Sequence, residues 1–133
     1  MSLRGYKMQL HNTITRDNLR ILMNSFYTKT LQNHELRNFF VHELGEDIKN
    51  EDWIEHIETL ADFWLATLLD EGPYEGNFVG MHIKIPHISR SSFITWMELF
   101  SISTDEIYVP KLAQQFKNQS MLLSEKFINE LKL

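Results

Sequence analysis

The sequence predicts an all-α protein in which one folded domain, residues 15–133, follows a partly disordered tail of residues 1–14. Apolar residues recur at intervals of three and four positions in four long stretches of the chain. No stretch shows the sustained alternation of apolar and polar residues that is typical of a half-buried strand. A length of 133 residues fits one domain with a sizeable core.

The first expected helix begins near Thr15 or Asp17, either of which can serve as its N-cap. Its apolar stripe follows the helical spacing i, i+3, i+4, i+7, i+8 and consists of Leu19, Leu22, Met23, Phe26 and Tyr27. A short segment with the sequence HELRNFF comes next, and Gly45 marks the loop after it.

Three further helices are expected, which gives four principal helices in all. One runs from about residue 50 to residue 69, where Gly72 and Pro73 stop it. The next spans about residues 89–107, and Pro110 suits the first turn of the last helix. A long connection, GPYEGNFVGMHIKIPH at residues 72–87, joins the helix that ends near residue 69 to the helix that begins near residue 89. We expect this connection to be non-helical.

The composition excludes several classes of protein. A net charge of −5 argues against binding to nucleic acid, because a phosphate backbone requires a basic surface. Without cysteine the chain has no disulfide, zinc–thiolate site, iron–sulfur cluster or cysteine nucleophile. No apolar run is long enough to span a bilayer or to form the core of a signal peptide. We therefore expect a cytoplasmic protein with no membrane and no nucleic-acid partner.

His82 stands out among the six histidines because it lies among apolar neighbours in the glycine-rich connection. A buried imidazole needs a partner, which here could be a backbone carbonyl, a metal ion or the iron of a haem. The spacing of nearby acidic residues supplies no second or third ligand for a bare metal ion. A haem needs only one axial histidine, because the porphyrin supplies four nitrogens, so the pattern favours haem over a bare metal.

Three other polar groups lie on apolar helix faces, namely those of Tyr27, His56 and Trp96. His56 shares its face with Trp53, Leu60 and Phe63, at positions i−3, i+4 and i+7. Each such group taken alone is most often a core residue whose polar atom binds a carbonyl or water. If the three converge, they form one polar pocket inside an apolar surrounding.

An ordered set of short motifs resembles the truncated haemoglobins, and specifically their third group, found in bacteria. The motifs are FY at 26–27, FF at 39–40, WIEH at 53–56, FW at 63–64, LLDEGPYEG at 68–76, His82 with Pro86, and FITWMELF at 93–100. The resemblance covers roughly residues 15 to 130. One departure is Asp70, at a position where the family often has glycine.

The resemblance implies a globin-like two-over-two helical sandwich that encloses haem b, which is iron protoporphyrin IX. It implies that His82 is the proximal ligand of the iron, and it makes His87 a surface residue. Tyr27 and Trp96 would be distal hydrogen-bond donors, with His56 beside them on the distal helix. Phe40 would pack against the porphyrin, and Leu60 and Phe63 would line the distal side.

The implied function is binding of oxygen, nitric oxide or carbon monoxide at haem iron. Two distal donors, each worth about 1.5–3 kcal/mol to a ligand that gains negative charge, would slow oxygen release. This favours a redox or nitrosative and oxidative stress role over oxygen transport, with nitric oxide dioxygenase-like or peroxidase-like activity as candidate reactions. The expected partners are these gases and an unidentified reductase, and the expected assembly is a monomer or weak dimer.

Two alternatives to this function stay open at the level of sequence. The first is a non-catalytic, haem-based module that binds or senses oxygen. The second is a helical interaction domain without a cofactor, in which the histidines are incidental.

Overall fold

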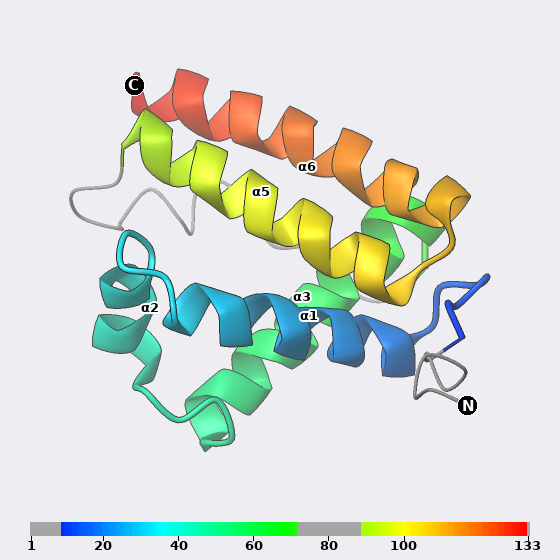
Figure 1. Ribbon diagram of the computed structural model, residues 1–133, viewed down its shortest axis with the longest axis horizontal. Coiled ribbons are helices and arrows are strands. Elements are labelled where there is room, and N and C mark those ends of the chain that lie inside the picture. The colour runs from blue at the N-terminus through cyan, green and yellow to red at the C-terminus, as the bar shows by residue number, and fades with distance from the viewer. Residues whose placement is uncertain (1–8, 72–88, 133) are drawn as a thin grey trace, which may run out of the picture.

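The computed structural model describes residues 9–71 and 89–132. These residues form five α-helices and no strand: α1 (Arg16–Leu31), α2 (Arg37–Leu44), α3 (Glu51–Leu69), α5 (Arg90–Ile107) and α6 (Pro110–Leu131) (Figure 1). The predicted all-α class is confirmed. None of the described helices is both long and apolar enough to cross a membrane.

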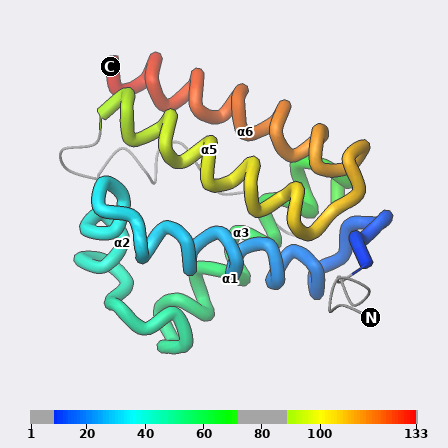
Figure 2. Tube along the Cα trace, viewed as in Figure 1, coloured from blue at the N-terminus to red at the C-terminus, as the bar shows by residue number. Residues whose placement is uncertain are grey.

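The four long helices pack as two pairs, α1 with α3 and α5 with α6, and the contact between α1 and α5 joins the two pairs. Helices α5 and α6 run antiparallel, since Phe93 stacks on Phe127 near one end and Lys117 pairs with Asp105 near the other (Figure 2). Helix α1 packs against both α3 and α5, and the short α2 packs against α1. His11 lies within the predicted tail of residues 1–14. Its backbone N–H donates to the carbonyl of Ile107, and its carbonyl accepts from the N–H of Val109.

The helix ends follow the capping signals of the sequence. Thr15, rather than Asp17, caps α1: its Oγ1 accepts from the backbone N–H of Asn18, whose side chain in turn accepts from the N–H of Thr15. Ser89 caps α5, and Pro110 is in the first turn of α6 as predicted. The predicted Gly72–Pro73 stop and the connection after it lie outside the described residues.

Part of the HELRNFF segment belongs to a short helix, α2, in addition to the four principal helices that the sequence predicts. This helix has eight residues, none of them fully buried, and its N-cap makes no side-chain hydrogen bond. Eight residues are too few to show a repeated apolar spacing, and no side-chain cap marks where this helix begins.

An aromatic cluster at the centre of the core joins four helices. Phe100 of α5 lies 5.3 Å from Phe26 of α1 and 5.4 Å from Trp64 of α3, measured between ring centroids. It also stacks on Trp96 at 5.6 Å and meets Phe116 of α6 at 6.2 Å. Because the rings interdigitate, the positions of α1, α3 and α5 are fixed relative to one another.

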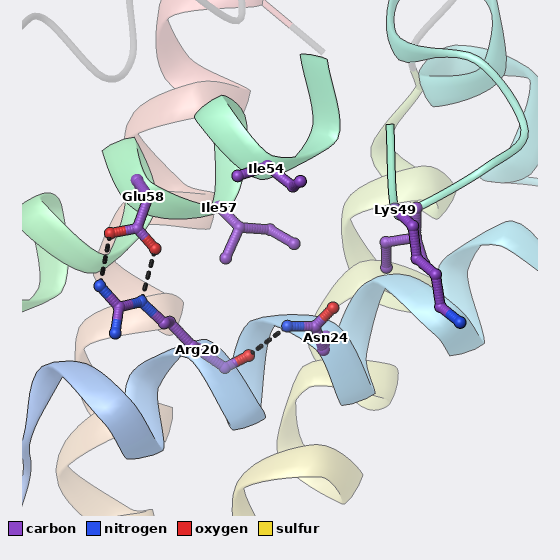
Figure 3. A pocket seen from close by; sticks show the side chains of 7 residues that line it. Arg20, Asn24, Lys49, Ile54, Ile57 and Glu58 are labelled. Carbon is purple, nitrogen blue, oxygen red and sulfur yellow. Dashed lines mark hydrogen bonds and ion pairs between the residues drawn. The ribbon is translucent and has the colours of Figure 1, made fainter. Parts of the chain in front are cut away.

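A surface pocket of about 310 Å³ lies where α1, α3 and the loop before α3 meet (Figure 3). It is lined by Arg20, Asn24, Ile48, Lys49, Ile54, Ile57 and Glu58. A second, more open one of about 620 Å³ lies on α5 and α6, lined by Ile94, Met97, Glu98, Ser101, Ile102 and Met121. Neither lining includes a residue that the sequence predicts for the site.

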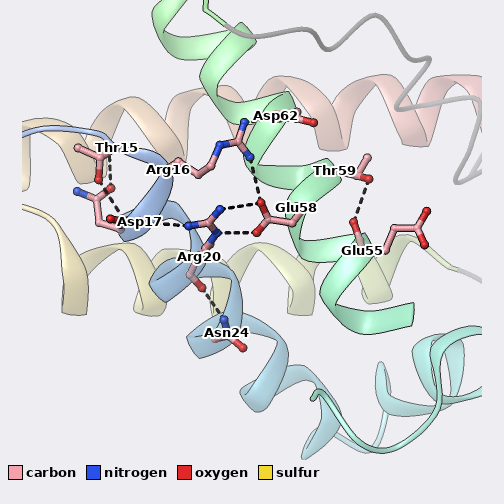
Figure 4. Close-up of polar contacts among 10 residues, drawn as sticks. Thr15, Arg16, Asp17, Arg20, Asn24, Glu55, Glu58, Thr59 and Asp62 are labelled. Carbon is pink, nitrogen blue, oxygen red and sulfur yellow. Dashed lines mark hydrogen bonds and ion pairs between the residues drawn. The ribbon is translucent and has the colours of Figure 1, made fainter. Parts of the chain in front are cut away.

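An ion-pair network joins α1 to α3 beside the first pocket (Figure 4). Glu58 accepts two hydrogen bonds from Arg20, at 2.6 Å from Nε and 2.9 Å from Nη2. Arg16 pairs with both Glu58 and Asp62. The hydrogen bonds from Arg20, together with the positive charges of both arginines, lower the pKa of Glu58 below its usual value of 4.5. The network therefore holds α3 along α1.

Asp70 ends α3 in the left-handed conformation, with φ of 54°. A side chain at such a position costs free energy that glycine avoids. We predict that Asp70→Gly raises the free energy of unfolding by about 0.5–1 kcal/mol, measured by urea denaturation. Asp70→Ala is the control, since it keeps the Cβ atom and should not stabilise. Equal stabilisation by glycine and alanine would contradict this explanation.

We predict that Glu58→Gln lowers stability at pH 7 by about 0.5–1 kcal/mol, the range of a half-exposed ion pair. Because the pKa of Glu58 is lower in the folded state, its contribution is complete above the usual value of 4.5 and disappears as pH falls through the folded value. The variant and the parent should therefore converge in stability at low pH. A difference that stays constant in urea titrations from pH 7 to pH 3 would rule out this role.

Candidate functional site

Two of the predicted site residues, Tyr27 and His56, meet directly between α1 and α3. The hydroxyl oxygen of Tyr27 lies 3.2 Å from Nε2 of His56, within hydrogen-bonding distance. Tyr27 is 3% exposed and His56 is half-buried. Either group can donate, because the direction of the bond depends on which nitrogen of the imidazole carries the proton.

Aromatic rings surround this polar pair. The ring of Tyr27 lies 5.3 Å from that of Phe40 and 5.0 Å from that of Trp53, measured between centroids. Trp53 also meets His56 at 5.6 Å with the two rings nearly perpendicular. The pair is thus a small polar spot in an apolar surrounding, where hydrogen bonds are electrostatically stronger than in water.

Burial raises the pKa of Tyr27 above the ordinary tyrosine value of 10. The phenol therefore stays protonated at neutral pH. It can donate one hydrogen bond and accept others, and it brings no negative charge into the apolar surrounding. Chemically, the pair can offer a neutral hydrogen-bond donor to a small polar or anionic group.

Trp96 reaches the pair through an intermediate ring. It lies on α5, half-buried, and stacks on Phe100 with only 4° between the ring planes. Its ring is perpendicular to that of Phe26 at 5.8 Å, and Phe26 in turn contacts Tyr27 at 4.8 Å. Among the described contacts, the structure therefore brings Tyr27 and His56 together and joins Trp96 to them only through Phe26.

The remaining predicted lining residues lie on α2 and α3. Leu60, one turn after His56, is 4% exposed, and Phe63 is 6% exposed. Phe40 of α2 is half-buried and packs on the same core. The predicted iron ligand His82 lies outside the described residues, and so does His87. No group of three or more metal-ligating side chains occurs within residues 9–71 and 89–132.

Sequence reasoning did not include Trp53 among the site residues. It is fully buried and touches both members of the pair, and its indole N–H donates to the carbonyl oxygen of Gly45 at 2.9 Å. The available signal was its i−3 spacing from His56, which puts both side chains on one face of α3. No sequence pattern indicates that the indole N–H of Trp53 donates to a loop carbonyl.

The arrangement of the described helices is that of a globin-type fold. No family model matches the chain. It is 28% identical over 119 residues to the group 3 truncated hemoglobin ctb of Campylobacter jejuni subsp. jejuni serotype O:2. The aligned region covers 90% of this chain and 92% of the relative. It also matches the crystal structure of the group III truncated hemoglobin from Campylobacter jejuni, with a TM-score of 0.85 and 27% identity.

That structural match covers 92% of this chain and 95% of the solved one. The resemblance predicted from the ordered motifs is confirmed, and so is the globin-like two-over-two fold. The chain is a homologue of a third-group truncated haemoglobin, and the correspondence extends over nearly the whole length of both proteins.

Proposed function

We propose that this chain is a globin-type haem protein that binds oxygen and other small diatomic ligands, nitric oxide and carbon monoxide, in a redox or stress-related role. The observation that carries the proposal is the contact of 3.2 Å between Tyr27 and His56, buried among aromatic rings. Homology to a third-group truncated haemoglobin supports it, because globins as a class hold haem.

The described residues fit a haem b group in chemical character. A porphyrin has a large apolar face. The hydrophobic core that includes Tyr27 also includes Leu60 and Phe63, and Phe40 packs against it. On the sequence argument and the resemblance, we propose that His82 would hold the haem iron. Bound haem would supply an iron atom that takes up a diatomic gas.

In this proposal Tyr27 is the main donor to the bound ligand. A hydrogen bond to a ligand atom that gains negative charge contributes about 1.5–3 kcal/mol. Each ~1.4 kcal/mol corresponds to a tenfold change in affinity, most of which appears in the dissociation rate. The raised pKa of Tyr27 supports this role, since only the protonated phenol can donate.

The tautomer of His56 determines whether the hydroxyl proton of Tyr27 is available to donate to a bound ligand. If Nε2 of His56 accepts, the hydroxyl proton of Tyr27 is directed to the imidazole and away from a ligand. If Nε2 carries a proton and donates to the hydroxyl oxygen, the hydroxyl proton is left for the ligand. We assign to Trp96 the role of a further donor from α5.

The proposed role is ligand chemistry rather than oxygen transport. A carrier must release oxygen readily, whereas donors in an apolar surrounding slow its release. The same donors can polarise a bound ligand for reaction with a second small molecule. Nitric oxide dioxygenase-like and peroxidase-like reactions both fit this description. The first would need a reductase as its source of electrons, and the second would need a reducing substrate.

We predict that His82→Ala loses stable haem binding, or keeps it only when free imidazole replaces the missing ligand. The measurement is a titration of the purified protein with haem, followed by absorbance in the Soret region. His87→Ala is the matched control and should bind haem as the parent does. An unaltered five-coordinate spectrum in His82→Ala would move the proximal role to His87 or His56.

We predict that Tyr27→Phe changes the oxygen dissociation rate by about tenfold or more, because one charge-assisted hydrogen bond is lost. The effect should also depend on His56, since the two side chains share a hydrogen bond. In a double-mutant cycle with His56→Ala, the coupling should be about fivefold or more. The rates are measured by stopped-flow replacement of oxygen with carbon monoxide.

Tyr108→Phe serves as the control in this cycle. It also removes one buried hydroxyl, which donates to Asn18 at 2.6 Å, near the start of α1 and nine residues before Tyr27. It should leave the oxygen dissociation rate unchanged. If Tyr27→Phe also leaves the rate unchanged, the Tyr27 hydroxyl does not reach the ligand.

A further inference from the structure

Trp53 contacts both members of the polar pair at once. Its ring centroid lies 5.0 Å from that of Tyr27, at 56° between the planes, and 5.6 Å from that of His56, at 83°. The side chain is completely buried. Because Trp53 and His56 are three residues apart on α3, the helix fixes the distance between their backbones. The helix does not fix the orientation of the Trp53 and His56 rings, which depends on their other contacts.

A hydrogen bond sets the angle of the indole. Its N–H donates to the carbonyl oxygen of Gly45 at 2.9 Å, in the loop between α2 and α3. A buried indole that turned away from this carbonyl would leave its N–H unpaired, which is costly. The position of the Gly45 carbonyl therefore determines how the Trp53 ring faces Tyr27 and His56.

The loop that provides this carbonyl is itself held in one conformation. The side chain of Asn50 donates from Nδ2 to the carbonyl of Leu44 at 2.8 Å and accepts from the backbone N–H of Trp53 at 2.8 Å. Gly45 has φ of +87°, a value that favours glycine. A Cβ atom added at Gly45 would come within 3.0 Å of Nδ2 of Asn50.

We propose that Trp53 is a positioning residue, which transmits the conformation of the Gly45–Asn50 loop to the Tyr27–His56 pair and so to the bound ligand. The inference rests on the proposed function, in which this pair faces the ligand. Trp53 itself touches no ligand in this scheme. Its indole ring orients the other two rings through these contacts, and its N–H anchors that orientation to the loop.

Packing alone is a weaker account of these contacts. Trp64, on the same helix, is also buried, and its described ring contacts are with Phe63, Phe100 and Phe116, which are apolar core residues. Trp53 instead contacts the two residues that carry the polar atoms of the site. A role in positioning predicts effects on these polar atoms that a role in packing does not.

The test compares Trp53→Phe with the parent and with Tyr108→Phe. Trp53→Phe keeps an aromatic ring and removes the N–H that bonds to Gly45. Tyr108→Phe removes one buried donor elsewhere and controls for a general loss of stability. The readouts are the ¹⁵N chemical shifts of the His56 ring, which report its protonated nitrogen and hydrogen bonding, and the oxygen dissociation rate of the haem-loaded protein.

In Trp53→Phe we expect retained haem binding, altered ¹⁵N shifts of His56 and an oxygen dissociation rate changed by about fivefold or more. Tyr108→Phe should resemble the parent in both readouts while melting at a lower temperature. Gly45→Ala, which moves the acceptor carbonyl and leaves Trp53 in place, should change the His56 shifts in the same sense as Trp53→Phe.

Two results would overturn the inference. One is a Trp53→Phe variant whose ¹⁵N shifts of His56 and oxygen dissociation rate both equal those of the parent. The other is equal changes in Trp53→Phe and Tyr108→Phe. If the parent binds no haem, the proposed function fails, and the His56 shifts of the haem-free protein still decide whether Trp53 orients the pair.

Discussion

The packing of α1 against α3 is the constraint on which the rest of the structure depends. It brings the hydroxyl of Tyr27 within 3.2 Å of the imidazole of His56 and surrounds both with aromatic rings. Tyr27 is buried and His56 is half-buried, and a buried hydroxyl left unpaired would cost about 1–3 kcal/mol. Paired with one another, they keep a hydrogen-bonding spot inside an apolar region. The Arg16–Arg20–Glu58–Asp62 network on the surface and the Phe100 cluster in the core hold the two helices in this arrangement.

The same arrangement explains how a site can be polar without being charged. Burial keeps the Tyr27 phenol protonated, so the pair offers a donor and no fixed negative charge to a ligand. The imidazole of His56 has two nitrogens, and its choice of tautomer redirects the Tyr27 proton. Small changes in ring orientation at this point would have a large effect on a ligand bound as proposed, because hydrogen bonds depend steeply on angle. The hydrogen bond from Trp53 to Gly45 limits such changes.

The principal helices could be predicted from sequence because each carries an apolar stripe and a recognisable start, such as Thr15 for α1 or Pro110 for α6. Helix α2 could not, since eight residues with no buried side chain give too short a pattern. The shared face of Trp53 and His56 followed from their spacing. The meeting of Tyr27 with His56 did not, because it depends on how α1 packs against α3. The bond between Trp53 and the Gly45 carbonyl has no sequence signal at all.

The most direct test of this account is a crystal structure of the haem-loaded protein with cyanide as the diatomic ligand. The account predicts that His82 binds the iron on one side of the porphyrin. On the other side, it places the cyanide within hydrogen-bonding distance of the Tyr27 hydroxyl, with His56 still beside that hydroxyl. Iron held by a residue other than His82, or a cyanide that the Tyr27 hydroxyl does not reach, would contradict it.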